Sequence, residues 1–266
     1  MINIGIAGAA GKMGSAIGAC ASKDKEVKII IAKEAPENKS VGADFYGIKI
    51  TDKFDDKIND IDVFIDFTTP KATVENLKVI SDAKKAMVIG TTGFNADELK
   101  VIGEYSKKIP IVLSSNYSVG VNVMWKILKL ITPVLKNDYD IDIVEAHHKN
   151  KKDAPSGTAV TCGKVIAEAK GIDYEKNVIF GRQGRDNERP RDQIGMLAVR
   201  AGGIIGEHTI IYASDGDKIE IKHTAFSRET FALGAIKAAK FVKDKPAKLY
   251  SMAEVLGIWF YSKRGF

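Results

Sequence analysis

The first 113 residues alternate short apolar segments with amphipathic ones, and this order constrains the fold more than any other feature. Segments with the length and composition of buried strands lie at 3–7, 27–32, 63–67, 87–89 and 110–113. Segments with the apolar spacing of helices lie between them, at 12–22, 72–84 and 97–107. Apolar strands that are separated by helices pair in parallel. We therefore predict an α/β, Rossmann-type doubly wound parallel sheet, with a dinucleotide-binding domain over residues 1–118.

The second half of the chain has a different order. A half-buried strand at 139–144 is followed by a helix from Ser156 to Lys170. Further strands are expected at 195–200, 207–213 and 218–223, after a transitional helix at 122–135. We predict a second, α+β domain over residues 119–227, with a mostly antiparallel or mixed sheet and the one helix from Ser156. Helical segments at 230–242 and 252–256 predict a C-terminal segment, 228–266, that returns to the first domain.

A glycine-rich turn, Gly8-Ala-Ala-Gly-Lys-Met-Gly14, joins the first strand to the first helix. Small residues there let the backbone approach a pyrophosphate, and the helix N-terminus offers N–H donors to it. The spacing differs from the common Gly-x-Gly-x-x-Gly, so a tight structural turn remains an alternative. Glu34, at the end of the second strand, is placed to bind the ribose hydroxyls of the cofactor. Small polar residues also follow later strands, at 68–69, 90–92 and 114–117.

A basic segment, Glu145-Ala-His-His-Lys-Asn-Lys-Lys-Asp-Ala-Pro-Ser-Gly-Thr158, lies between the expected strand and the helix from Ser156. It offers a proton donor, positive charge and helix N-terminal amides, which suit a small anionic substrate that must be protonated. A solvated lysine-rich loop is the alternative interpretation. A metal site is not expected, because successive strand residues point to opposite faces and no cysteine or acidic cluster completes a ligand set.

The composition excludes several partners. The net charge is +6, but the lysines are spread along the chain and no arginine-rich tract appears, so nucleic acid is not expected. No apolar run approaches the roughly 20 residues of a membrane span, and no signal peptide is recognised. Cys20 and Cys162 lie in helical patterns and are expected to be reduced, buried thiols. We expect a cytoplasmic protein.

Motifs along nearly the whole chain resemble the 4-hydroxy-tetrahydrodipicolinate reductase family, also called dihydrodipicolinate reductases, of bacterial lysine and diaminopimelate biosynthesis. The glycine-rich turn is shared with many nucleotide-binding proteins, whereas the His-His block is highly specific. The matching blocks are Gly8–Gly14, Asp66-Phe-Thr, Gly90-Thr-Thr-Gly-Phe94, Asn116–Met124, Glu145-Ala-His-His148, Asp153–Thr158, Arg200-Ala-Gly and Gly206-Glu-His-Thr209.

The resemblance implies an oxidoreductase that uses NADH and/or NADPH, acts on a small cyclic dicarboxylate and forms a homotetramer, with the second domain serving substrate binding and oligomerisation. It implies that His147 is the general acid and Lys151 the second catalytic donor. His148, Gly157 and Thr158 are implied as substrate contacts. The implied cofactor residues are Gly8, Ala9, Ala10, Gly11, Lys12, Met13, Glu34, Gly90, Thr91, Thr92, Ser114, Ser115, Asn116 and Tyr117.

Two positions depart from the family pattern. Ala35 stands where some members have an arginine for the 2′-phosphate of NADPH, so we expect NADH to be used at least as well. Asn150 stands where some members have a further histidine. Two other functions are alternatives. A semialdehyde dehydrogenase would need a reactive cysteine, and Cys162 is expected inside a helix. A noncatalytic nucleotide sensor would not need the intact cluster around His147.

Overall fold

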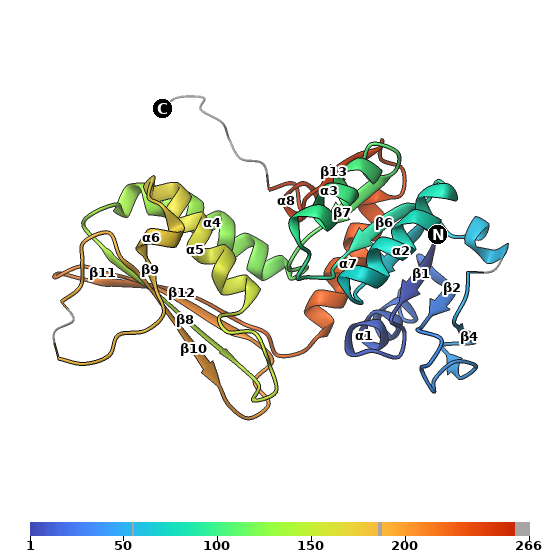
Figure 1. Ribbon diagram of the computed structural model, residues 1–266, viewed down its shortest axis with the longest axis horizontal. Helices are drawn as coiled ribbons and strands as arrows, with labels where there is room; N and C mark the ends of the chain where they lie inside the picture. The colour runs from blue at the N-terminus through green and yellow to red at the C-terminus, as the bar shows by residue number, and fades with distance from the viewer. Residues whose placement is uncertain (55, 186–187, 259–266) are drawn as a thin grey trace. The chain divides into compact units, whose positions relative to one another are not determined.

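The computed structural model describes residues 1–54, 56–185 and 188–258, and the chain divides into two compact units (Figure 1). The first unit contains Met1–Val119 together with the chain from Arg228 onward, and the second contains Gly120–Ser227. Each unit has its own sheet and its own hydrophobic core.

The first unit is built on an eight-stranded sheet with the order β13-β7-β6-β5-β1-β2-β4-β3. All neighbours pair in parallel except β3 and β4. The chain proceeds outward from β1 in both directions, so the strand order reverses beside β1, which is where ligands bind in sheets of this type. The strands are β1 (Ile2–Ala7), β2 (Val27–Lys33), β3 (Asp44–Phe45), β4 (Ile48–Thr51), β5 (Val63–Asp66), β6 (Ala86–Ile89), β7 (Pro110–Leu113) and β13 (Lys248–Tyr250).

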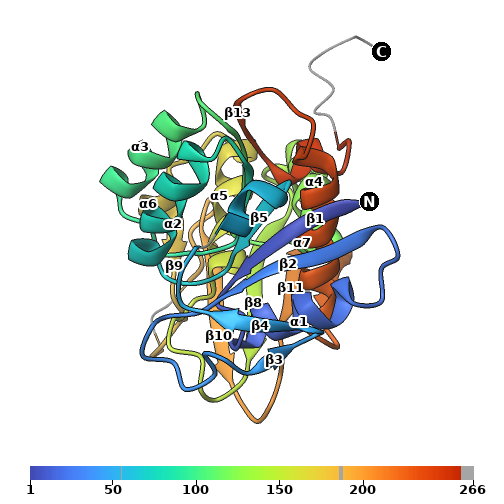
Figure 2. The ribbon, with the colours of Figure 1, turned by 90° about the vertical axis from the view of Figure 1, so that its right-hand side faces the viewer.

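Helices cover both faces of this sheet, as predicted for a doubly wound fold. Figure 2 shows α2 and α3 on one side of the strands and α1 and α7 on the other. Alternate residues of the central strands enter separate cores: Ile65 packs in the cluster with α1 and α7, and Phe64 in the cluster with α2. The bounds are α1 (Lys12–Ala21), η1 (Asp56–Asp60), α2 (Pro70–Asp82), α3 (Ala96–Tyr105), α7 (Glu229–Val242) and α8 (Met252–Val255).

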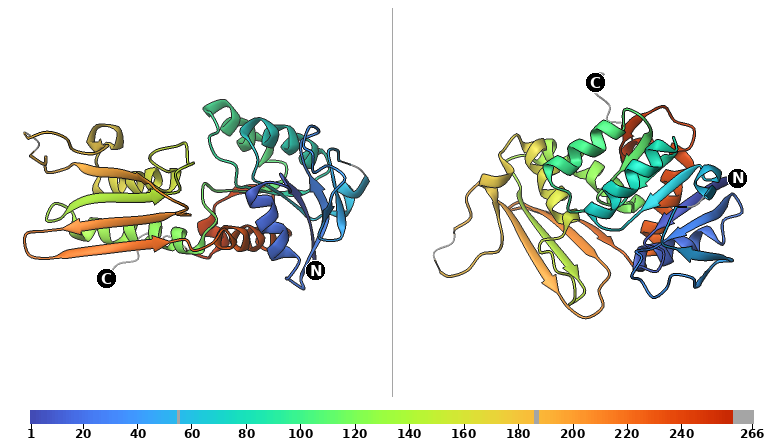
Figure 3. Two further views of the ribbon diagram at one scale, coloured as in Figure 1. Left: turned by 90° about the horizontal axis from the view of Figure 1, so that it is seen from below. Right: turned by 45° about the vertical axis from the view of Figure 1, so that its right-hand side comes forward.

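The second unit has a five-stranded mixed sheet with the order β12-β11-β8-β10-β9. β11 pairs antiparallel with β12 and β8, whereas β10 pairs in parallel with β8 and β9. Figures 1 and 3 show α4 and α5 on one face of this sheet. The elements are α4 (Val119–Leu135), β8 (Asp140–His147), α5 (Gly157–Lys170), α6 (Tyr174–Asn177), β9 (Val178–Ile179), β10 (Ile194–Arg200), β11 (Glu207–Ala213) and β12 (Lys218–Thr224).

The second unit departs from the sequence expectation in two ways. It contains more than the one helix from Ser156, because α4 packs Leu128 into the same core as Ile166 of α5, and α6 follows α5. The strand expected at 139–144 continues to His147, where the alternation of buried and half-buried residues persists. His147 is therefore held by a paired strand end rather than by a loop.

Candidate functional site

The first candidate site is a pocket of about 630 Å³ at the carboxyl ends of β1, β2 and β5, a volume typical of ligand sites. Of the predicted cofactor residues, it is lined by Gly8, Ala10, Gly11, Lys12, Met13 and Glu34. Residues that the site prediction did not include also line it: Ala7, Lys33, Ala35, Pro36, Asn38, Phe67, Thr68, Thr69, Ala72, Glu75 and Asn76.

Glycine is required in the β1–α1 turn for two geometric reasons. Gly8 has φ +65°, a left-handed conformation that side chains rarely adopt. A Cβ at Gly14 would lie 2.0 Å from the Gly8 carbonyl oxygen and 2.7 Å from Ala9 Cα, so the helix could not approach the strand as closely. The turn, called the cofactor cradle below, therefore exposes backbone without large side chains at the N-terminus of α1, which fits a pyrophosphate.

Glu34 lies beside this cradle. Its carboxylate accepts hydrogen bonds from the backbone N–H of Ala10, at 3.0 Å, and of Ala35, at 3.1 Å. An acidic side chain at the end of β2, within reach of the glycine-rich turn, fits the ribose hydroxyls of a dinucleotide. The Lys33 ammonium instead lies 5.3 Å from the centroid of the Phe54 ring.

The other predicted cofactor residues do not line this pocket. Gly90, Thr92, Ser114, Ser115 and Asn116 lie at or after the carboxyl ends of β6 and β7, at the same edge of the sheet. Ala9 is buried, and the Tyr117 side chain is only 1% exposed. The Tyr117 hydroxyl lies 2.8 Å from the carbonyl oxygen of Ile89 and 3.1 Å from that of Val112, and its one proton is donated to this pair, so a ligand could meet this position only through its backbone.

Thr91 belongs to a buried polar network that the sequence prediction missed. Asp66, at the end of β5, is fully buried and accepts hydrogen bonds from Thr68 Oγ1 at 2.6 Å and from Asn76 Nδ2 at 2.8 Å. The Thr73 hydroxyl oxygen lies 3.1 Å from the same carboxylate and 2.8 Å from Thr91 Oγ1, and its single proton can be donated to either. This carboxylate therefore ties the loops after β5 and β6 together at the edge that carries the pocket.

The second candidate site lies on the sheet of the second unit, where register brings distant residues together. Arg200 of β10 pairs with His147 of β8, and His208 of β11 pairs with Glu145. Glu145 and His147 are two apart on one strand and point to the same, helix-covered face. Three strands thus place a carboxylate, a guanidinium and two imidazoles in one cluster.

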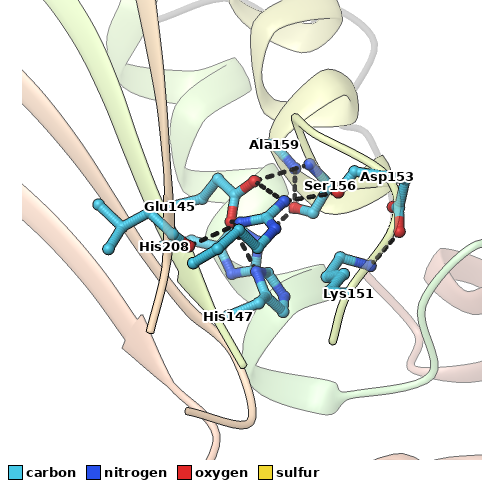
Figure 4. Close-up of polar contacts among 9 residues, drawn as sticks. Glu145, His147, Lys151, Asp153, Ser156, Ala159 and His208 are labelled. Atoms are coloured by element: carbon cyan, nitrogen blue, oxygen red, sulfur yellow. Dashed lines mark hydrogen bonds and ion pairs between the residues drawn. The ribbon is translucent and has the colours of Figure 1, made fainter. Parts of the chain in front are cut away.

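Glu145 is the hub of this cluster, as Figure 4 shows. Its side chain has no exposed surface. Oε2 lies 2.6 Å from His147 Nδ1 and accepts from Arg200 Nη1 at 2.8 Å. Oε1 accepts from Arg200 Nη2 at 2.7 Å and from the backbone N–H of Ser156 at 2.9 Å. Every donor that a buried carboxylate needs is therefore supplied.

The surroundings shift the titration of these groups. Burial lowers the pKa of His147, and the adjacent Glu145 carboxylate opposes that shift. The pKa of Glu145 is also lowered: burial would raise it, but the hydrogen bonds from Arg200, His147 and Ser156 outweigh burial. Burial lowers the pKa of His208 to about 3, so this ring is neutral near pH 7.

Ser156 connects the cluster to the helix. It caps the N-terminus of α5 by accepting the Ala159 N–H at 3.2 Å, and its Oγ lies 2.9 Å from His208 Nε2. Gly157 and Thr158 are the first two residues of α5. The positive end of the helix dipole is thereby fixed next to His147, an arrangement that favours an anion.

Lys151 follows in the loop between β8 and α5. Its ammonium lies 2.8 Å from the Asp153 carboxylate, and the backbone oxygen of Asp153 accepts from Arg200 Nη2 at 2.6 Å. His148 is half-buried, and among residues 1–54, 56–185 and 188–258 no hydrogen bond or ion pair joins its side chain to the cluster. The structure thus gathers His147 with the N-terminus of α5 and places Lys151 beside Asp153.

The described part of the chain contains neither a metal-binding cluster nor a membrane-spanning helix. No group of His, Cys, Asp and Glu side chains there is arranged to hold a metal ion. No helix there is long and apolar enough to cross a membrane. Both cysteines are buried and unpaired with one another, and burial raises the pKa of the Cys162 thiol to about 12, which does not suit a nucleophile.

Comparisons with known proteins agree with this geometry. Residues 2–117 match the family "Dihydrodipicolinate reductase, N-terminus", and residues 120–256 match "Dihydrodipicolinate reductase, C-terminus". The chain is 44% identical, over 97% of its length and 100% of the relative's, to the 4-hydroxy-tetrahydrodipicolinate reductase of Geotalea uraniireducens (strain Rf4). It is 45% identical, with the same coverage, to the protein of that name from Geobacter metallireducens (strain ATCC 53774 / DSM 7210 / GS-15).

Solved structures give the same result. The dipicolinate-bound dihydrodipicolinate reductase from Paenisporosarcina sp. TG-14 has a TM-score of 0.73 and 25% identity, over 96% of this chain and 98% of that one. Aspartate semialdehyde dehydrogenase II from Vibrio cholerae has a TM-score of 0.52 and 11% identity, over 98% of this chain and 100% of that one, which shows a shared fold only. Since both halves and the full length match, this chain belongs to the dihydrodipicolinate reductase family of oxidoreductases.

Proposed function

We propose that this protein reduces 4-hydroxy-tetrahydrodipicolinate, by way of dihydrodipicolinate, to tetrahydrodipicolinate in lysine and diaminopimelate biosynthesis, with His147 as the proton donor. The observation that carries the proposal is the pair of hydrogen bonds by which one carboxylate joins His147, at 2.6 Å, to the N-cap of α5, at 2.9 Å. An acid beside an anion-binding helix end suits a dicarboxylate that must be protonated.

A reduced nicotinamide supplies the hydride when it is bound. The residues of this chain then have to protonate the ring carbon next to the one that receives the hydride. Nε2 of His147 is the ring nitrogen that Glu145 leaves for the substrate, and Lys151 lies in the following loop. Burial lowers the pKa of His147. The negative charge of two substrate carboxylates would raise that pKa again and favour the imidazolium that donates the proton.

Substrate binding is assigned to the groups around the start of α5. The N-terminal amides at Gly157 and Thr158 suit one carboxylate, and the Lys151 ammonium suits the other or the ring nitrogen. His148, which follows β8, is a further proposed contact. Lys149 and Lys152 are exposed and are expected to be solvated.

The cofactor is proposed to be NADH and/or NADPH, with NADH used at least as well. Glu34 would bind the ribose hydroxyls of NADH, and its charge would repel a 2′-phosphate. Ala35 lines the pocket and supplies no guanidinium to offset that repulsion. Lys33 also lines the pocket, with its ammonium 5.3 Å from the centroid of the Phe54 ring.

A homotetramer in the cytoplasm is also proposed, on the basis of the family resemblance. The face of the second sheet opposite its helices carries exposed Leu197 and Val199, which are 38% and 43% exposed. Neighbouring apolar residues on an open sheet face are typical of surfaces that another protein surface covers. Light scattering of the purified protein would test the tetramer.

The proposed reaction is tested by following the oxidation of NADH and of NADPH with freshly made substrate. The proposal expects oxidation that depends on the substrate and is inhibited by dipicolinate, together with formation of tetrahydrodipicolinate. Oxidation by neither cofactor, in protein that binds both cofactor and dipicolinate, would refute it. A ratio of kcat/KM values that favours NADPH tenfold would refute the cofactor preference alone.

A further inference from the structure

We infer that Glu145 is a positioning residue for proton donation: it fixes the His147 ring so that Nδ1 carries the permanent proton and Nε2 exchanges the catalytic one. This inference deepens the proposed reduction and rests on it for its kinetic consequence. Its structural part, the position of the protons on His147, can be measured without any turnover.

The protonation state of Glu145 follows from its hydrogen bonds. Its two oxygens accept hydrogen bonds from both terminal nitrogens of Arg200 and from the Ser156 N–H. Three hydrogen bonds, two of them from one bidentate guanidinium, stabilise the ionised form. Glu145 therefore faces His147 as an acceptor, and the 2.6 Å contact requires that Nδ1 is the donor.

The opposite nitrogen of the His147 ring, Nε2, is the one that exchanges the catalytic proton. With a proton held on Nδ1, neutral His147 has its lone pair on Nε2, so the ring takes up and releases its second proton there. A Cβ at position 206 would lie 3.1 Å from Nε2, so the glycine at this position leaves the space beside that nitrogen open. Among the described residues, no hydrogen bond to Nε2 is found.

Glu145 also couples the proton donor to the proposed substrate site. Glu145 Oε1 holds the backbone N–H of Ser156, the N-cap of α5, while Oε2 holds the His147 ring. One rigid carboxylate, which Arg200 orients from β10, therefore sets the distance between the proton donor and the helix end that would bind the substrate. Such fixed geometry is what a proton transfer needs.

The charged and titratable groups around His147 come from each neighbouring element. Glu145 lies on the same strand, Arg200 on β10, His208 on β11, and Lys151 in the loop that follows. Of these, only Glu145 stabilises the imidazolium; Lys151 and Arg200 oppose it. Loss of the carboxylate charge therefore has two effects: it releases the ring, and it lowers the pH at which His147 becomes protonated.

The variant Glu145→Gln tests both effects. Its amide oxygen can replace Oε1, which accepts from two donors, whereas the amide nitrogen in place of Oε2 loses the hydrogen bond from Arg200 Nη1. That nitrogen then faces Nδ1 and donates to it. That reverses the neutral tautomer, so the proton sits on Nε2 of an uncharged ring that is a very weak acid. By analogy with the orienting carboxylate of hydrolase triads, where the amide substitution imposes the wrong tautomer, we expect kcat to fall by about 10²–10⁴.

The direct measurement is the nitrogen spectrum of the histidine rings in isotopically labelled full-length protein, assigned with His147→Gln. At a pH where the ring is neutral, we expect a protonated Nδ1 and an unprotonated Nε2 in the parent, and the reverse in Glu145→Gln. A protonated Nε2 in the parent would overturn the inference, even if the variant failed to fold.

Kinetics and a matched control complete the test. Glu145→Gln should keep dipicolinate affinity within about threefold, lower kcat, and move the alkaline fall of kcat to lower pH, whereas Glu145→Asp should recover part of kcat. Glu207→Gln removes a carboxylate of the neighbouring strand that pairs with Lys222 at 2.9 Å and should change neither kcat nor the tautomer. Near-parental kcat in Glu145→Gln would refute the positioning role. If the His147 ring shows the expected tautomers but the protein reduces no substrate, the proposed reaction is refuted while the positioning of His147 by Glu145 stands.

Discussion

The ion pair between Lys151 and Asp153 predicts that removal of an acidic side chain improves substrate binding. The Lys151 ammonium lies 2.8 Å from the Asp153 carboxylate, so a substrate carboxylate must compete with Asp153 for it. The Asp153 side chain is 57% exposed, and exposed pairs of this kind contribute about 0.2–1 kcal/mol. Since 1.36 kcal/mol corresponds to a factor of ten, Asp153→Asn should lower the substrate KM and the Kd for dipicolinate by about 1.4- to 5-fold.

The substitution is specific, because Arg200 bonds the backbone oxygen of Asp153, which Asn retains. Titration calorimetry with dipicolinate and steady-state kinetics would measure the two constants. Glu168→Gln, which removes a similar exposed pair with Lys129 at the other end of α5, serves as the control and should change neither. Unchanged or weaker binding in Asp153→Asn would refute competition and would show that Asp153 orients Lys151 for the substrate.

Three further predictions concern the cofactor cradle and the stability of the second unit. Ala35→Arg places a guanidinium beside Glu34 and should shift the ratio of kcat/KM values toward NADPH by about tenfold, or ~1.4 kcal/mol. An unchanged ratio would show that the 2′-phosphate of NADPH does not lie beside position 35. Gly14→Ala should destabilise the protein by ~1–3 kcal/mol in urea unfolding and weaken NADH binding, because the new Cβ would lie 2.0 Å from the backbone carbonyl oxygen of Gly8. The control Gly103→Ala places its Cβ where nothing lies within 4 Å and should be neutral or stabilising, and equal effects of the two substitutions would contradict the close packing at Gly14. Burial lowers the pKa of His208 to about 3, so below pH 6.5 this histidine is protonated in the unfolded chain but stays neutral in the folded one, and the free energy of unfolding should fall by ~1.4 kcal/mol per pH unit as the pH drops. His208→Asn should flatten that slope, and an identical slope in the variant would disprove the role of His208.

The parallel sheet of the first unit could be predicted because its strands are short and apolar on both faces. Val63–Asp66, for example, is buried at every position, and a helix follows it. The two-residue strand Asp44–Phe45 and the edge strand Lys248–Tyr250 were not predicted. Each has too few residues to establish a period, and its pairing depends on residues distant in sequence.

The second unit was harder to predict for a similar reason. The alternation of residues typical of strands is recognisable at 194–200 and 207–213. The local sequence does not indicate that the first strand pairs in parallel with Asp140–His147 and that the second pairs with it antiparallel. The helix expected at 122–135 is present, but it was predicted as a transition between the domains, whereas the structure packs its Leu128 into the second core.

The site was predicted where its residues are close in sequence and missed where strand register assembles it. Arg200 and His208 meet Glu145 across two strand pairs, which no local pattern reveals. Glu145 itself had a usable signal, since it lies two residues before His147 on an alternating strand and so shares its face. The network around Asp66 was likewise missed, because Thr73 and Asn76 reach it from the following helix.

We propose that His147, rather than its neighbour His148, supplies the proton during reduction. The most direct test compares kcat for His147→Gln and His148→Gln with freshly made substrate and saturating NADH. We predict a loss of about 10²–10⁴ in kcat for His147→Gln, and for His148→Gln mainly a higher KM. Near-parental kcat in His147→Gln, or a larger loss in His148→Gln, would contradict this account.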